Sequence, residues 1–182
     1  MSERDSELPR SYVVLTAVGP DRPGLVEQIS TLIHRAGANL EDSRMAILGG
    51  EFALILLLSG SQAAVAVVQD QGQALAERLG LTLSLKATQP RTGRSDFIAY
   101  QLKVSGVDRP GIVARVSALL AGRQINVAAL DSNVGYAPLS GTPMFHLQAV
   151  LQVPSVLALS ELRSSIAALC EDENLDFALE SR

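Results

Sequence analysis

The sequence predicts an α+β protein made of two similar domains in tandem, and three observations support this prediction. A loop occurs twice, as GPDRPGLV at 19–26 and as GVDRPGIV at 106–113. In each half of the chain, strand-like and helical hydrophobic patterns follow one another in the same order. The composition is 47% hydrophobic with a mean hydropathy of +0.23, which is ample apolar material for packed cores.

The repeat extends beyond the loop itself. With an offset of 87 residues and no gaps, eight of the nineteen positions in 21–39 are identical to their counterparts in 108–126. Self-similarity over this length indicates that a whole domain was duplicated. The matched positions used below are Asp21 and Asp108, Arg22 and Arg109, Pro23 and Pro110, Gly24 and Gly111, Leu25 and Ile112, and Asn39 and Asn126.

The first half contains six predicted elements. Its strand-like stretches are β-branched or alternate in polarity, and its helical stretches have apolar residues three and four positions apart. Gly37 is placed to end the first helix, and Gly49-Gly50 is a typical hairpin turn, whereas Gly72 weakens the second helix. In the order strand, helix, strand, strand, helix, strand, the segments are 12–18, 24–37, 39–48, 51–60, 61–80 and 81–87.

The second half repeats this order. Its two middle strands are joined by a longer loop, 135–143, and its segments are 97–106, 110–122, 125–134, 144–153, 155–174 and 175–181. The order βαββαβ, written twice, predicts two ferredoxin-like domains, each an antiparallel four-stranded sheet with two helices on one face. We expect a polar N-terminal tail at 1–10, a first domain at 11–88, a linker at 89–96 and a second domain at 97–182.

The sheet face that carries no helices is predicted to differ between the domains. In 51–60 both faces are apolar, whereas in 144–153 one face carries His146, Gln148 and Gln152. Exposing a large apolar face is costly, since burying each Val or Leu side chain is worth about 1.5–3 kcal/mol. We therefore expect the other domain or a second chain to cover this face of the first domain.

Charge and cysteine content exclude several classes of protein. The net charge is −4, the pI is about 5.2 and no Lys/Arg cluster occurs, which argues against direct binding of nucleic acid. The start of the chain lacks the apolar region of a signal peptide, and no apolar run reaches the ~18 residues of a membrane span. A single cysteine, Cys170, fits a reducing compartment, so we expect a cytoplasmic protein without a membrane segment.

No pattern in the sequence predicts an enzyme. Nucleophile-elbow, dinucleotide-binding and Walker motifs are missing. His34 and His146 are expected to be solvated, and with one cysteine they make no usual zinc set. Cys170 follows a helical apolar pattern and is expected to be a buried hydrophobe. We expect no catalytic residue, no metal and no cofactor.

Two interpretations of the repeated loop are open. As a structural turn, Pro23 takes the first helical position, and Asp21 caps the helix by accepting a hydrogen bond from the N–H of Gly24 or its neighbour. As a ligand site, the helix start presents backbone N–H groups to an anion such as a carboxylate. Asn39 and Asn126, which follow the first helix of each half, offer the donor and acceptor that an amino acid needs.

The chain resembles the ACT domain in each half, from about Tyr12 to Leu179, because DRPG closes the first strand and an Asn follows the first helix of a βαββαβ unit. ACT domains are small regulatory units that typically bind amino acids, often at domain or subunit interfaces. The resemblance implies that Gly24, Asn39, Gly111 and Asn126 are ligand-loop positions. The candidate ligand-binding residues are Asp21, Arg22, Pro23, Gly24, Leu25, Asn39, Asp108, Arg109, Pro110, Gly111, Ile112 and Asn126.

Two such units with nothing else resemble the glycine cleavage system transcriptional repressor family. This resemblance implies a non-enzymatic amino-acid sensor, with glycine as the first ligand to test, that acts through a protein partner such as a transcriptional activator and is expected to be a homodimer. The second half departs from the ACT pattern because Gln124 stands where the first half has Gly37. Two alternatives remain: an interaction scaffold with vestigial ligand loops, or an ACT regulator of a different amino-acid enzyme.

Overall fold

The computed structural model describes residues 10–89 and 96–182, and most of the predicted tail and linker lies outside these ranges. The chain divides into two compact units, Met1–Thr92 and Gly93–Arg182, which are described separately below. Within the described residues, no helix is long and apolar enough to cross a membrane.

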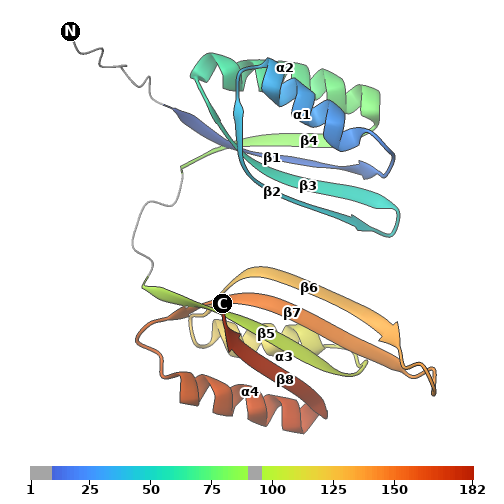
Figure 1. Ribbon diagram of the computed structural model, residues 1–182, viewed down its shortest axis with the longest axis vertical. Helices are drawn as coiled ribbons and strands as arrows, with labels where there is room; N and C mark the ends of the chain where they lie inside the picture. Colours follow the sequence, from blue (N-terminus) through green and yellow to red (C-terminus); the bar gives the residue numbers. More distant parts are fainter. Residues whose placement is uncertain (1–9, 90–95) are drawn as a thin grey trace. The chain divides into compact units, whose positions relative to one another are not determined.

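Each unit is an antiparallel four-stranded sheet with two helices on one face (Figure 1). This confirms the predicted α+β class and the βαββαβ order in both halves. In domain 1 the elements are β1 (Ser11–Pro20), α1 (Leu25–Arg35), β2 (Asn39–Leu48), β3 (Glu51–Gly60), α2 (Gln62–Leu79) and β4 (Thr82–Thr88). In domain 2 they are β5 (Phe97–Val107), α3 (Ile112–Ala121), β6 (Asn126–Tyr136), β7 (Pro143–Pro154), α4 (Leu159–Glu173) and β8 (Leu175–Ser181).

The two sheets have equivalent strand orders, β2-β3-β1-β4 and β6-β7-β5-β8. The central strand that precedes each repeated loop is therefore flanked on both sides, and the loop leaves the sheet from its middle. A bulge interrupts the β2–β3 ladder between Leu40 and Asp42, and another interrupts the β6–β7 ladder between Val127 and Ala129. Since these positions differ by 87 residues, the duplication has kept this backbone irregularity.

Each domain has its own core between the sheet and its helices. In domain 1, Leu15, Phe52 and Leu58 are fully buried against α1 and α2, whereas in domain 2 Leu102 and Leu147 occupy the equivalent layer. These side chains alternate with outward-facing ones along their strands, as the alternating sequence predicts. Gly49 and Gly50 form the predicted two-residue turn between β2 and β3, with φ of +61° and +85°.

The helix-free faces of the sheets differ in chemistry, as the sequence predicts. On domain 1 the paired strands β1 and β3 present Val18 and Ile55, which are 48% and 46% exposed. On domain 2 the paired strands β5 and β7 present Ser105 beside His146. Coverage of the apolar face by other parts of the protein or by a second chain stays a prediction.

All four helices begin later than predicted, α2 by one residue because Ser61 is its N-cap. Helices α1 and α3 start at Leu25 and Ile112, so neither Pro23 nor Pro110 takes the first helical position. Helix α4 starts at Leu159, four residues after the predicted start at Ser155. The start of α4 is misplaced because the apolar residues Val156 and Leu157 precede the helix. The starts of α1 and α3 are misplaced because proline favours a first helical position that the backbone does not yet adopt here.

Candidate ligand-binding loops

The repeated loop turns the chain from the central strand into the first helix through a left-handed glycine. Gly24 is the N-cap of α1 with φ of +91°, and Gly111 is the N-cap of α3 with φ of +94°. This backbone region disfavours residues with a Cβ atom, so both loops need glycine at this position. The predicted capping by Asp21 is wrong, because no side chain makes a capping hydrogen bond at the start of α1.

A second glycine in each loop is fixed by close packing. A Cβ atom on Gly19 would lie 2.7 Å from the carbonyl oxygen of Gly80, which belongs to the turn after α2. A Cβ atom on Gly106 would lie 2.6 Å from Leu175 and 3.0 Å from the carbonyl oxygen of Asn174. The spacing of the glycines in GPDRPG and GVDRPG therefore has a steric cause in the fold.

Backbone hydrogen bonds hold both loops against the neighbouring hairpin. The N–H of Asp21 donates to the carbonyl oxygen of Gly50 at 3.0 Å, and the N–H of Asp108 donates to that of Pro143 at 3.0 Å. Leu25, at the first helical position of α1, is buried and anchors the end of the loop. The side chains of Asp21 and Pro23 remain exposed. Backbone contacts thus anchor the loops, and the side chains of Asp21 and Asp108 remain accessible.

Arginines tie each loop to the end of the domain's second helix, by different routes. In domain 1, Nη2 of Arg22 donates to the carbonyl oxygen of Leu79 at 2.9 Å. In domain 2 this connection comes from Arg115, whose Nε lies 2.6 Å from Oε1 of Glu173 and whose Nη2 donates to the carbonyl oxygen of Pro110 at 3.2 Å. The sequence pattern does not single out Arg115. The only available signal is that the second half has Arg115 at the position where the first half has Gln28.

The starts of α1 and α3 are able to receive an anion. The first N–H groups of a helix have no partner within the helix, and neither start has a side-chain cap. By contrast, α2 is capped conventionally, because Oγ of Ser61 accepts a hydrogen bond from the N–H of Ala64 at 3.1 Å. The N–H groups at an uncapped helix start, together with the helix dipole, favour a carboxylate.

Asn39 opens β2 and takes part in a small polar cluster. Its Nδ2 donates to Oε1 of Glu41 at 2.9 Å, and Oγ of Ser59 donates to the same oxygen at 2.5 Å. These two hydrogen bonds lower the pKa of Glu41, with that from Ser59 the larger cause. Glu41 therefore remains ionised and engages one donor of the Asn39 amide.

Asn126 holds the matching position on β6 but has a different partner. Its Nδ2 donates to Oε1 of Gln152 on the paired strand at 2.7 Å. In domain 2 the bulge residue that corresponds to Glu41 is Ala128, so this domain has no carboxylate at that position. The two asparagines are thus equivalent in backbone position and different in electrostatic surroundings.

The structure does not bring the loop and the asparagine of one domain together. Gly24 precedes α1 and Asn39 follows it, so the full helix, about 16 Å for eleven residues, separates them. The ten residues of α3 likewise stand between Gly111 and Asn126. One amino acid is too short to contact both positions within one domain.

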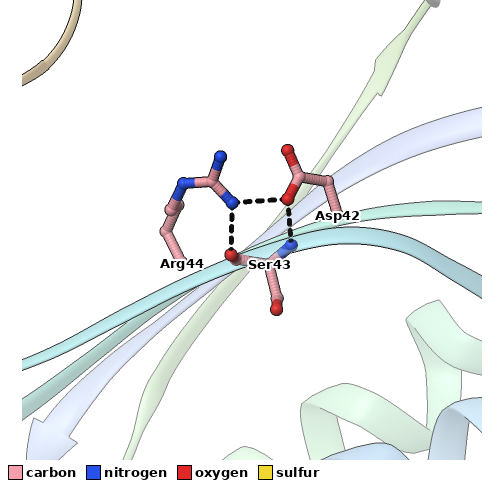
Figure 2. Close-up of polar contacts among 3 residues, drawn as sticks. All are labelled: Asp42, Ser43 and Arg44. Atoms are coloured by element: carbon pink, nitrogen blue, oxygen red, sulfur yellow. Dashed lines mark hydrogen bonds and ion pairs between the residues drawn. The ribbon is translucent and has the colours of Figure 1, made fainter. Parts of the chain in front are cut away.

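Next to the β2 bulge lies a local ion pair on the sheet edge (Figure 2). Nη1 of Arg44 lies 2.5 Å from Oδ1 of Asp42, which also accepts a hydrogen bond from the N–H of Ser43 at 2.8 Å. The Arg44 hydrogen bond is the largest cause of the lowered pKa of Asp42. Both side chains are exposed, so this pair contributes little to stability.

The two histidines and the single cysteine have the surroundings that the sequence predicts. His34 and His146 are exposed on different domains, as predicted, and no cluster of His, Cys, Asp or Glu in the described ranges could hold a metal ion. Cys170 is buried in the core of domain 2, which confirms the predicted role. Burial raises the pKa of its thiol, so the reactive thiolate is disfavoured.

The departure at Gln124 leaves the fold unchanged. Gln124 has φ of +56°, the same left-handed conformation that Gly37 takes with φ of +76° after α1. The chain therefore ends α3 with the same type of turn, at the energetic cost of a side chain in that region.

Comparisons with known proteins agree with this architecture. ACT-domain family models match residues 11–86 and 100–159. The chain is 32% identical over 163 residues to the glycine cleavage system transcriptional repressor of Escherichia coli strain K12, covering 90% of this chain and 86% of the relative. A crystal structure of an unknown protein from Galdieria sulphuraria matches with a TM-score of 0.83 and 30% identity, over 96% of this chain and 99% of that one.

A second crystal structure, of a protein provisionally assigned as a glycine cleavage system transcriptional repressor, matches with a TM-score of 0.71 and 30% identity. It covers 94% of this chain and 96% of that one. The similarity therefore spans both domains and nearly the whole length of the relatives. On this basis, the chain belongs to the family of the glycine cleavage system transcriptional repressor, which it matches with two ACT domains in tandem.

Proposed function

We propose that this protein is a non-enzymatic regulator that senses an amino acid, with glycine as the first candidate, and modulates transcription of glycine cleavage genes through a protein partner. The observation that carries the proposal is the match of two ACT domains, without a further domain between them, to a transcriptional repressor over 86% of its length. The uncapped helix starts at Gly24 and Gly111 support the sensing step, because they suit the carboxylate of an amino acid.

The separation of loop and asparagine within each domain indicates how the ligand is held. An amino acid that uses both must contact the loop of one ACT domain and the asparagine of another, and we propose that a second copy of the chain supplies that other domain. The carboxylate would face the N–H groups after Gly24, and the ammonium group would face the amide oxygen of an Asn39 and the carboxylate of a Glu41. In this proposed arrangement the protein is a homodimer, and ligand binding would stabilise it.

A protein partner explains regulation better than direct contact with DNA. The chain carries a net charge of −4 and a pI of about 5.2, whereas DNA-binding surfaces are strongly basic. A bound amino acid changes the affinity for such a partner only if it binds one state of the regulator more tightly than the other. We expect the partner protein to bind the ligand-stabilised dimer with a different affinity from the ligand-free protein.

Asparagine variants in a transcriptional reporter test the proposal. In a strain without its own repressor, the wild-type chain should make a glycine-cleavage promoter respond to glycine. Asn39→Ala and Asn126→Ala should together raise the glycine concentration for half-maximal response at least tenfold, because a hydrogen bond to a charged group is worth about 1.5–3 kcal/mol. Asn133→Ala is the matched control, since Asn133 is an exposed asparagine on β6 that is not among the candidate ligand-binding residues.

The second candidate is an interaction scaffold with vestigial loops. It is favoured by one observation: the amides of Asn39 and Asn126 already have protein partners, Glu41 and Gln152. A scaffold predicts that the double asparagine variant regulates like the wild type. An unchanged half-maximal glycine concentration in that variant would contradict amino-acid sensing at these positions. An ACT regulator of a different amino-acid enzyme would instead leave the glycine-cleavage promoter unaffected.

A further inference from the structure

The helix-free face of the first sheet has an apolar centre. Val14 on β1 pairs with Leu57 on β3, and Thr16 pairs with Ile55 in the next row of the same face. These residues point away from the helices, because along β3 they alternate with buried core residues such as Leu56. Ile55 is 46% exposed. A contiguous apolar face of this kind indicates an interaction surface.

The matching face of domain 2 is polar. By register, polar residues take the places of apolar ones, namely Gln148 for Ile55, Ser105 for Val18 and His146 for Ala53. Lys103, opposite Gln148, forms an ion pair with Glu180 at 3.2 Å. Covering an apolar face with these groups would remove their water without giving them new partners, which is costly. A second copy of the apolar face is the better match, because apolar side chains then meet at the centre.

Opposite charges border this apolar centre on the edge strand β2 (Figure 2). Asp42 pairs with Leu57 and Arg44 pairs with Ile55, so both charged side chains lie on the helix-free face. In a two-fold symmetric interface, contacts between two positions occur twice and reciprocally. If the two sheets meet antiparallel with the axis between these rows, Asp42 faces Arg44 of the partner subunit and Leu57 faces Ile55 of the partner subunit. The face is thus complementary to itself in both charge and polarity.

The size of the face suits a reversible dimer. Strands β1, β2 and β3 have ten residues each and β4 has seven. With about 3.3 Å per residue and about 4.8 Å between strands, the face measures roughly 450–650 Å². Two copies would bury about 900–1,300 Å² in total, at the lower end of the range for specific interfaces. An apolar centre with a charged rim is also the usual anatomy of such interfaces.

We infer that the helix-free face of domain 1 is the dimer interface of this protein and packs antiparallel against the same face of a second copy. Ile55 and Leu57 form its centre, and Asp42 contacts Arg44 of the partner subunit at its rim. This inference rests on the homodimer of the proposed function and names the surface that forms it. Since the sheets run antiparallel, the Gly24 end of one sheet lies toward the Asn39 end of the other, which is the direction that the proposed ligand contact needs.

Sedimentation velocity of the full chain at increasing concentration, without any amino acid, measures this dimer. The wild type should dimerise reversibly. Ile55→Lys should raise the dimer dissociation constant at least about tenfold, because it buries an unpaired charge at the apolar centre. Gln148→Lys, the same change at the matching position of domain 2, is the control and should leave the constant unchanged. Circular dichroism checks that both variants are folded.

A charge exchange tests the pairing at the rim and does not depend on the folding of Ile55→Lys. In Asp42→Arg and in Arg44→Asp, like charges face each other across the interface, so each variant alone should dimerise a few-fold more weakly than the wild type. An equimolar mixture of the two restores opposite charges between the chains, although neither chain keeps the pair within itself. We expect the mixture to form heterodimers with a dissociation constant close to that of the wild type.

The outcomes separate this interface from the sensing function. A wild type that stays monomeric at every concentration, with and without glycine, overturns the inference. A dimer that folded Ile55→Lys leaves intact, or a mixture that associates no better than its separate components, overturns it as well. Sensing is judged by a different readout, the glycine response of the promoter. A dimer that follows these expectations in a chain without that response supports the interface and contradicts the sensor.

Discussion

At the scale of single residues, steric requirements of the fold account for the glycines of the repeated loop without any role in binding. Gly24 and Gly111 are needed for a positive φ, whereas Gly19 and Gly106 are needed because backbone packs directly against them. The sequence pattern singles out Gly24 and Gly111, which recur at the same offset, but not Gly19 and Gly106. The close approach at Gly19 and Gly106 involves a turn that lies about sixty to seventy residues further along the chain, so a local pattern does not reveal it.

We expect Gly106→Ala to destabilise domain 2 by roughly 1–3 kcal/mol, because its new methyl group meets Leu175 and the backbone of Asn174 at overpacked distances. Gly135→Ala is the matched control in the same domain, since nothing lies within 4 Å of its Cβ position. That variant should be neutral or slightly more stable, because alanine restricts the unfolded chain more than glycine. Urea unfolding of both variants, followed by circular dichroism, measures the difference; equal stability would contradict the steric account.

At the scale of elements, the strands and turns lie close to where the sequence predicts them, whereas the helices begin later than predicted. Alternation fixes which face of a strand is buried, so the core positions of β3 and β7 were predictable. A helix start is set by the residue whose side chain or backbone closes the first turn. Asp21 is a good cap by type, yet the left-handed Gly24 places the helix start beyond its reach. Local propensity alone does not reveal such a turn.

The caps of α2 and α4 make a matched pair for experiment. Ser61 caps α2 through its hydroxyl, whereas Ala158 occupies the same position of α4 with a similar extended backbone and no side-chain cap. We expect Ser61→Ala to lower the free energy of unfolding of domain 1 by about 0.5–2 kcal/mol. Ala158→Ser should stabilise domain 2, because it also creates a capping box with Glu161. Urea denaturation checks both signs, and a gain from Ser61→Ala would contradict the capping assignment.

At the scale of the whole molecule, duplication has preserved the backbone and allowed the surfaces to diverge. Loop glycines, bulges and strand order recur in both domains. The exposed sheet faces, the surroundings of Asn39 and Asn126, and the exchange of Gln28 for Arg115 differ. Hydrophobic pattern and offset therefore predicted the fold and the candidate residues. The separation of loop from asparagine and the ion pair of Arg115 depend on tertiary contacts, which no local pattern encodes.

The central claim is that this two-domain chain is an amino-acid sensor, and calorimetric titration of the purified protein with glycine tests it most directly. The account predicts saturable binding of glycine by a protein that is dimeric when ligand is present. The remaining common amino acids, titrated in the same way, define the specificity. Absence of binding for every amino acid, from a chain that still represses the glycine-cleavage promoter, would contradict the account.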